Sequence, residues 1–378
     1  MRRRRARLGG LPLVLALAAC ASGAATGQAG PGPGAGAARG WTRIDPGGET
    51  MCARGTPYAF WARRAEPERL LVFFQGGGGC WDAETCRPGS DFLKDAVSRD
   101  EDPTGKPGVF DLENPGNPFR GWSMLFVPYC TGDVHWGDHV RTYDDSSAAA
   151  RREGWSRVTM RHKGYVNARA ALAWAYEQVP DPERVLVSGC SAGSVASILF
   201  TPYVIREYPD ARVAQLGDAE AFVFDRPVDL QTDYRAHDNF PSWIPALRAI
   251  PAGEFTMERF YSAVAASHPE AVFAQYTTAH DSVQIRYYEA VAESRDSADS
   301  HAATAASPSW EQALEASLEA IHARAPNFRS FVAAGHEHCA TPTRRFYDES
   351  VGGTRLAEWV ADLAEGRPVE DVRCARCD

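Results

Sequence analysis

The sequence predicts an α/β fold in which a mostly parallel sheet is covered by helices on both faces. Three observations support this prediction. The run RLLVFFQ at 69–75 is almost entirely apolar, as expected for a strand buried on both faces. The segment at 167–179 carries apolar residues at helical spacing. Downstream of it, strand-like and helix-like segments alternate, which is typical of a parallel sheet with crossover helices.

The individual elements follow from the same patterns. A first strand is expected at 58–62, ahead of the buried strand at 69–75, and a third at 123–129. After the helix at 167–179, strands are expected at 184–189, 212–218, 271–278 and 328–335, and helices at 192–205, 281–294, 309–325 and 355–365. The stretches 88–120 and 225–253 lack this periodicity, and the first is polar and rich in Pro and Gly. We expect both to be loop insertions rather than domain boundaries.

A leader precedes the predicted fold. Residues 1–20 combine five arginines with a short apolar core and end on LAAC, a pattern typical of a bacterial lipoprotein signal peptide in which Cys20 carries the lipid. An ordinary secretory signal, cleaved at a small-residue site, is the alternative, and both would export the chain. Residues 21–40 are rich in Gly, Ala and Pro, so we expect a flexible tether there. The remaining residues, 41–378, are expected to form one α/β domain.

The net charge of the chain indicates which classes of partner the protein is expected to bind. The whole chain has a formal net charge of −9, and removal of the five leader arginines changes it to −14. Such a surface is not expected to bind nucleic acid. The only membrane contact that the sequence predicts is the lipid on Cys20, and the oligomeric state is left open.

Cysteine usage fits an exported protein. Eight cysteines remain besides Cys20, an even number that suggests disulfides. Cys80 and Cys86 are one candidate pair. Cys374 and Cys377 form a C-x-x-C within the last five residues, where a structural disulfide is expected. A redox site or half of a zinc site is the alternative, but a zinc site would need a second paired cluster.

The segment GCSAG at 189–193 lies between a predicted strand and a predicted helix. This context is typical of a nucleophile elbow, in which flanking glycines allow a sharp turn that exposes the serine hydroxyl. The helix that follows directs its N-terminal N–H groups toward a developing oxyanion. We therefore interpret Ser191 as a catalytic nucleophile, and a plain tight turn is the alternative.

A serine nucleophile needs a base, and histidine is the usual one. Two histidines follow the last predicted strand in AAGHEHCAT, and His338 is followed directly by Cys339. If the side chains of Ser191 and His338 meet, Cys190 and Cys339 lie within reach of a disulfide. The competing hypothesis is a metal site built on His336 and His338, for which His135 and His139 are loose further candidates.

In hydrolases with a nucleophile elbow, the triad residues occur in the chain order Ser, acid, His, and an oxyanion donor comes from a loop after an early strand. This order guides the assignment of the acid and of the oxyanion donors. Asp281 follows a predicted strand and precedes a helix, and we favour it as the acid, whereas Asp218, at the end of the strand after the elbow, is the rival. An aspartate at such a position can also simply cap a helix. Gly76 to Gly79 follow the buried strand, and their unshielded N–H groups predict an oxyanion hole. A phosphate loop is excluded because no G-K-[ST] follows.

Taken in order, these motifs resemble the pectinacetylesterase/Notum family of extracellular serine carboxylesterases. The matching segments are GGGGCWD, VPYCTGDVHWGD at 127–138, GCSAGS, Asp281-x-x-Gln284 and the final His-Cys. The arrangement Cys-Ser, Asp, His-Cys also resembles that of tannases and fungal feruloyl esterases. The chain departs from the family at Gly78 and Gly79, where an aromatic residue is frequent, and at Ser194, where a second glycine is frequent.

The resemblance implies an α/β-hydrolase-like fold and a triad of Ser191, Asp281 and His338. It also implies an oxyanion hole formed by the N–H groups of Gly77, Gly78 and Ala192. The expected function is a serine carboxylesterase that hydrolyses short, acetyl-type esters of carbohydrates or small molecules through an acyl-enzyme, with no cofactor or metal. The alternatives are a metal-dependent hydrolase built on His336 and His338, and a non-catalytic surface binding protein.

Overall fold

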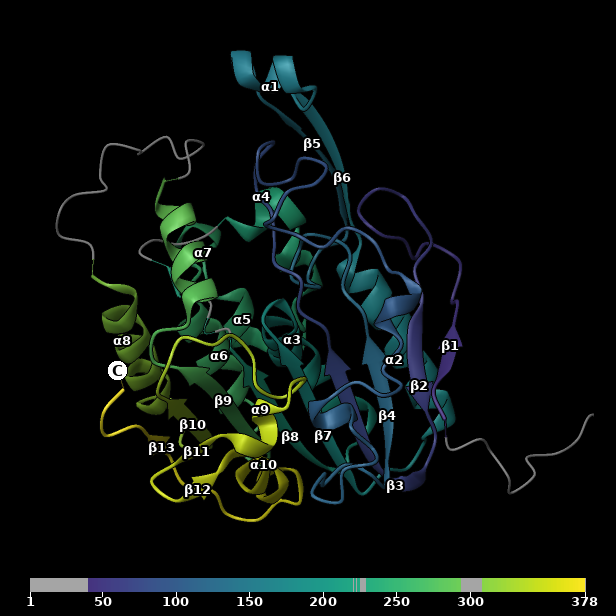
Figure 1. The fold of residues 1–378 in the computed structure, drawn as a ribbon, viewed down its shortest axis with the longest axis vertical. Coiled ribbons are helices and arrows are strands. Elements are labelled where there is room, and N and C mark those ends of the chain that lie inside the picture. Colours follow the sequence, from purple (N-terminus) through teal and green to yellow (C-terminus); the bar gives the residue numbers. More distant parts are fainter. Residues whose placement is uncertain (1–39, 220, 222, 225–228, 294–307, 378) are drawn as a thin grey trace, which may run out of the picture. The chain divides into compact units, whose positions relative to one another are not determined.

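A nine-stranded sheet forms the centre of the protein (Figure 1). The computed structural model describes residues 40–219, 221, 223–224, 229–293 and 308–377, so the predicted signal peptide and all but the last residue of the tether lie outside the described part. The strands lie in the order β1 (Thr42–Ile44), β2 (Phe60–Arg63), β4 (Trp122–Val127), β3 (Glu66–Phe74), β7 (Arg184–Cys190), β8 (Arg212–Asp218), β9 (Val272–Thr278), β10 (Phe328–Ala333) and β13 (Val372–Arg373).

Neighbouring strands from β4 to β13 are parallel, and β1 and β2 add an antiparallel edge. The prediction of a mostly parallel sheet is therefore confirmed. The strands in the middle of the sheet are apolar because they are covered on both sides. Side chains of β3 show this most clearly: Leu70, Val72 and Phe74 belong to one buried cluster, and Leu71 and Phe73 to another.

Helices cover both faces, as predicted. The cluster that contains Leu70 includes buried side chains of α2 (Gly164–Gln178), α3 (Ala192–Glu207), α6 (Met257–Ala266) and α8 (Trp310–His322). The cluster that contains Leu71 includes side chains of α9 (Arg345–Asp348) and α10 (Leu356–Ala364). None of the helices in the described ranges is long and apolar enough to cross a membrane.

The two segments predicted to be loop insertions are more integrated than expected. Val109 and Phe110, in the 3₁₀ turn η2 (Gly108–Phe110), pack against the sheet face that contains Phe73, and Phe110 stacks edge-on with Phe73 at 5.0 Å between ring centroids. The described part of 225–253 contains the short helices α4 (Leu230–Tyr234) and α5 (Pro245–Arg248). Leu230, Tyr234 and Leu247 of these helices are buried in the main core cluster. Both segments therefore contribute side chains to the core.

The remaining elements are short or lie outside the main sheet. A hairpin of β5 (His139–Asp144) and β6 (Arg157–His162), with α1 (Ala148–Glu153) between its strands, extends away from the sheet (Figure 1). The others are α7 (Ser282–Glu293), β11 (Ser350–Val351), β12 (Thr354–Arg355), η1 (Arg99–Glu101), η3 (Ala236–Asn239) and η4 (Ala252–Glu254).

The chemically notable side chains follow the carboxyl ends of the parallel strands. The glycine run follows β3, Ser191 follows β7, Asp281 follows β9, and His338 follows β10. Because parallel strands end at the same edge of a sheet, ligands of open α/β folds bind there. The topology therefore gathers the predicted site residues at one edge.

Candidate active site

Ser191 lies in a strained turn between β7 and α3. Its backbone has φ of 56° and ψ of −127°, a conformation that few residues other than glycine adopt, and such strain is typical of a nucleophile elbow. The flanking residues must be glycines for steric reasons. A Cβ on Gly189 would collide with the carbonyl of Gly193, and a Cβ on Gly193 would collide with the carbonyl of Phe74.

The glycine loop after β3 packs directly on this elbow. A Cβ on Gly76 would lie 2.6 Å from the carbonyl oxygen of Cys190 and 2.8 Å from the Cβ of Ser191, so only glycine allows this close approach. Gly78 has a φ of 75°, in the left-handed region that favours glycine. The close packing brings the predicted oxyanion loop next to the predicted nucleophile.

Hydrogen bonds hold the glycine loop in place from two sides. On one side, the N–H of Gly79 donates to Phe92 O at 2.9 Å, and the N–H of Lys94 donates to Gly77 O at 2.8 Å. On the other side, His135 Nε2 donates to Gln75 O at 2.9 Å. Among the described residues, no backbone carbonyl accepts from the N–H of Gly77 or Gly78. These two groups are therefore available to bind a ligand oxygen.

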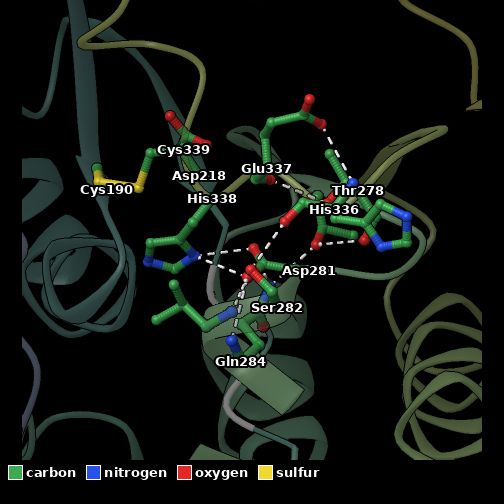
Figure 2. A network of polar contacts seen from close by, with 12 residues as sticks. Cys190, Asp218, Thr278, Asp281, Ser282, Gln284, His336, Glu337, His338 and Cys339 are labelled. Atoms are coloured by element: carbon green, nitrogen blue, oxygen red, sulfur yellow. Dashed lines mark hydrogen bonds and ion pairs between the residues drawn. A yellow bond between two sulfur atoms is a disulfide. The ribbon is translucent and has the colours of Figure 1, made fainter. Parts of the chain in front are cut away.

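His338 and Asp281 lie in direct contact (Figure 2). The Nδ1 atom of His338 donates to the Asp281 carboxylate, at 2.8 Å from Oδ2 and 3.0 Å from Oδ1. Asp281 is fully buried, and the His338 side chain is 17% exposed. Because a carboxylate can only accept, this contact selects the tautomer with the proton on Nδ1 and leaves Nε2 able to accept a proton.

The Asp281 carboxylate is itself held by the first turn of α7. Oδ1 accepts from the backbone N–H groups of Val283 and Gln284, each at 3.0 Å, and Oδ2 accepts from Gln284 Nε2 at 3.0 Å. The Gln284 amide also donates to Thr277 Oγ1 at 3.0 Å. These bonds offset the cost of burying a carboxylate and fix its orientation toward His338.

Asp218, the rival acid, binds the loop that carries His338 rather than its imidazole. Its carboxylate accepts from the N–H of Ala340 at 3.0 Å and from the N–H of Thr341 at 2.7 Å, and the Thr341 hydroxyl also donates to it. Its backbone carbonyl accepts from the N–H of Ser191 at 2.8 Å. Burial raises the pKa of Asp218, and the bonds from Thr341 and Ala340 oppose this shift. Asp218 therefore links the elbow to the histidine loop.

A disulfide joins the same two segments. Cys190, directly before Ser191, is bonded to Cys339, directly after His338, with 5.8 Å between their Cα atoms (Figure 2). The sequence suggested this pairing, because one cysteine directly precedes the predicted nucleophile and the other directly follows the predicted base. The other bridges in the described residues are Cys52–Cys130, Cys80–Cys86 and Cys374–Cys377.

Removing the Cys190–Cys339 bridge is expected to impair both stability and turnover. The double variant Cys190→Ser/Cys339→Ser should lose about 2–5 kcal/mol of unfolding free energy, because the bridge closes a long loop. The rate of ester hydrolysis should also fall, because the histidine loop loses its covalent link to the elbow. Denaturant unfolding and ester hydrolysis would measure the two effects. The double variant Cys374→Ser/Cys377→Ser is the control, since that bridge spans three positions in the sequence. Unchanged activity of the first variant would contradict this role.

The proposed metal ligands do not converge. His336 and His338 point to opposite sides of Asp281, and the exposed ring of His336 lies 5.6 Å from that of His280 (Figure 2). His135 is buried under the glycine loop, and burial lowers its pKa to about 4. In the described part of the chain, no group of three or more His, Cys, Asp and Glu side chains is placed to hold a metal ion.

Two cavities meet at Ser191. The larger one, with a volume of about 680 Å³, is also lined by His338 and by the glycine loop. Three acidic and three basic residues contribute to its walls, namely Asp91, Lys94, Asp100, Glu101, Lys106 and Arg286. The smaller cavity, of about 40 Å³, lies beside Ala192 and is mainly apolar, with walls that include Trp81, Val134 and Leu230.

The sequence patterns did not identify the walls of the larger cavity. Lys94 and Glu101 form an ion pair of 2.7 Å, and Lys94 Nζ also donates to Gln75 Oε1 at 2.9 Å. Burial lowers the pKa of Lys94, and the contact with Glu101 opposes this shift. Both residues belong to the 88–120 segment, whose polar composition carried no periodic signal. The nearest indication was that only eight residues separate this segment from the glycine loop.

Comparison with known proteins supports a family assignment. Pectin acetylesterase 11 from Arabidopsis thaliana is 27% identical over 164 residues, which are 42% of this chain and 38% of that protein. Palmitoleoyl-protein carboxylesterase notum2 from Xenopus laevis is 31% identical over 98 residues, 25% of this chain and 20% of that protein. A Danio rerio relative named inactive palmitoleoyl-protein carboxylesterase notum1b is 28% identical over 95 residues, 24% of this chain and 68% of that protein. This chain thus matches less than half the length of the first two relatives.

The likeness extends to the fold. The structure of the Wnt deacylase Notum from Drosophila superimposes with a TM-score of 0.62 at 14% sequence identity, and the match covers 90% of this chain and 96% of that one. The predicted α/β-hydrolase-like class is therefore confirmed. The family model described as pectinacetylesterase matches residues 45–375, nearly all of the described part. The chain belongs to the pectinacetylesterase family.

Proposed function

We propose that this protein is a serine carboxylesterase that acts through an acyl-enzyme. The observation that carries the proposal is the contact of His338 with the buried Asp281 beside a cavity that Ser191 also lines. His338 Nε2 accepts the proton of Ser191 Oγ as that oxygen attacks the ester carbonyl. The N–H groups of Gly77, Gly78 and Ala192 stabilise the resulting oxyanion.

The second half of the cycle reuses the same groups. When the tetrahedral intermediate collapses, His338 gives its proton to the departing alkoxide, and the alcohol leaves. A water molecule then loses a proton to His338 and attacks the acyl-enzyme. Collapse of this second intermediate returns the proton to Ser191 and releases the carboxylic acid. This scheme assigns no step to a metal or an organic cofactor.

We further propose that the substrate is a short-chain ester of a polar alcohol. A small, mainly apolar cavity of about 40 Å³ lies next to Ser191 and Ala192, and its size suits an acetyl group better than a long acyl chain. The larger cavity carries acids and bases in equal number, which favours a neutral, hydroxyl-rich alcohol such as a carbohydrate over a polyanion. The names of the relatives include both acetylesterases and palmitoleoyl esterases, and the small cavity favours the first.

We also propose that the protein is exported. The disulfides in the described residues fit an oxidising compartment. The leader at 1–20, with a lipid on Cys20, would supply the membrane anchor. A non-catalytic binding role is the second candidate function, because one matching relative is named inactive.

Labelling with a fluorophosphonate probe tests the proposed chemistry. The wild-type protein is expected to be labelled at one serine and to hydrolyse p-nitrophenyl acetate, with neither property sensitive to EDTA. The Ser191→Ala variant should lose labelling and lower kcat by about 10⁴-fold or more. Loss of hydrolysis in EDTA, with Ser191→Ala still active, would indicate the metal-dependent hydrolase instead. A folded wild-type protein that is neither labelled nor active would indicate the binding role.

A further inference from the structure

The two cavities beside Ser191 are separated by a thin wall. Among the described residues, only Gly78, Ser191 and Tyr287 contribute to the walls of both. Gly78 has no side chain, and Ser191 is the proposed nucleophile, so the aromatic ring of Tyr287 is the large side chain among these three residues. A change at this position would therefore alter the size of both spaces.

One face of helix α7 runs along both cavities. Val283 lines the larger cavity, Tyr287 lines both, and Val291 lines the smaller one. These residues are four positions apart, so they lie in line on the same side of the helix. The helix begins directly after Asp281, which ties its position to the proposed triad.

Tyr287 is fixed in its boundary position by a hydrogen bond and by aromatic contacts. Its hydroxyl donates to Phe92 O at 2.5 Å. Its ring packs edge-on against Phe92 and Trp81, with centroid separations of 5.5 Å and 6.3 Å. Phe92 O also accepts from the N–H of Gly79. The same carbonyl thus binds the glycine loop and the tyrosine that closes the small cavity.

The glycine at position 78 makes this closure possible. A Cβ on Gly78 would collide with both Phe92 O and the Tyr287 hydroxyl. The tyrosine hydroxyl therefore occupies space that a side chain at position 78 would need. Each part of this wall is therefore held in contact with another.

We propose that Tyr287 is the residue that sets the upper limit on acyl chain length, by closing the small apolar cavity against the large one. This inference rests on the proposed esterase function and adds a specificity-determining residue to it. An acetyl group fits within the closed cavity, whereas a chain of several methylenes would collide with the Tyr287 ring. Removing the ring would join the apolar space beside Trp81 and Val291 to the 680 Å³ cavity.

The test compares acyl chain lengths on the full chain. We would measure kcat/KM for p-nitrophenyl acetate, butyrate and octanoate with the wild-type protein and with the Tyr287→Ala and Tyr287→Leu variants. The ratio of octanoate to acetate is expected to rise by about tenfold or more in both variants, because a pocket discriminates by about tenfold or more per misfitting methylene. The second variant keeps the test usable if the first does not fold.

Tyr288→Phe is the matched control. The neighbouring tyrosine donates to Pro308 O at 2.8 Å and lines neither cavity, so the octanoate to acetate ratio should stay at the wild-type value. If Tyr287 had only a structural role, its replacement would lower kcat/KM equally for esters of all chain lengths. The octanoate to acetate ratio would then stay unchanged, and that result would overturn the inference. Failure of the proposed function is distinguishable from this, because the wild-type protein would then show no Ser191-dependent turnover of any ester.

Discussion

Replacing His338 with alanine is expected to lower kcat for p-nitrophenyl acetate by about 10⁴- to 10⁶-fold, as in other enzymes that lose the base of a triad. The physical reason is that Ser191 keeps its proton when no base faces it, so its hydroxyl is a weak nucleophile. Nδ1 of His338 is bound to Asp281 at 2.8 Å, and only Nε2 remains to accept that proton. Steady-state kinetics on purified protein, with circular dichroism to verify folding, would measure the loss.

His336→Ala is the matched control for this prediction. The His336 ring is exposed and contacts His280 rather than the cavity. The backbone carbonyl of His336 accepts from the backbone N–H of Ser282, and an alanine at position 336 keeps this hydrogen bond. We expect its kcat to stay within about threefold of the wild-type value, because His336 does not line the cavity and a surface substitution usually changes the unfolding free energy by no more than about 0.5 kcal/mol. If His336→Ala proved as damaging as His338→Ala, the assignment of the base would be wrong.

Asp281→Asn is expected to lower kcat by about 10⁴-fold, because an amide at this position selects the wrong imidazole tautomer. The unfolding free energy should fall by only about 1–3 kcal/mol, because the new NH₂ group would face the Gln284 amide that donates to Oδ2. The Asn side chain has almost the same shape, and its oxygen can still accept from the N–H groups of Val283 and Gln284. Its NH₂ group, however, would donate to His338 Nδ1 and shift the ring proton to Nε2. The imidazole would then be unable to accept the proton of Ser191. Kinetics and thermal unfolding, measured side by side, would separate the two effects.

Asp218→Asn provides the contrast that distinguishes the two aspartates. Its carboxylate accepts three N–H or O–H bonds from Ala340 and Thr341, and an amide would turn a donor toward at least one of them. We expect the unfolding free energy to fall by about 1–3 kcal/mol, with a smaller loss of kcat than in Asp281→Asn. If Asp218→Asn lost as much activity at unchanged stability, Asp218 would be the better candidate for the triad acid.

Much of the architecture could be predicted because its signals are local. The apolar run that forms β3 and the helical spacing in α2 each lie within one short segment, and their predicted bounds agree with the structure to within a few residues. The segment 88–120 could not be predicted in this way. Its buried apolar residues Val109, Phe110 and Phe119 are spaced irregularly among polar, Pro and Gly residues, and their burial depends on a sheet face formed by distant strands.

The site residues also differ in how far the sequence alone could predict them. The amino-acid sequence by itself determined the elbow around Ser191, because a strand, two glycines and a helix N-terminus are all encoded within a few positions. It left Asp218 and Asp281 as rivals, because Asp218 ends one parallel strand and Asp281 follows shortly after the end of another. Only the order of strands decided between their contacts: β9 lies beside β10, so Asp281 reaches the imidazole of His338, while Asp218 on β8 binds the loop beyond it. The wall at Tyr287 likewise depends on Phe92, which is distant in sequence, because a cavity is formed by segments that meet only after folding.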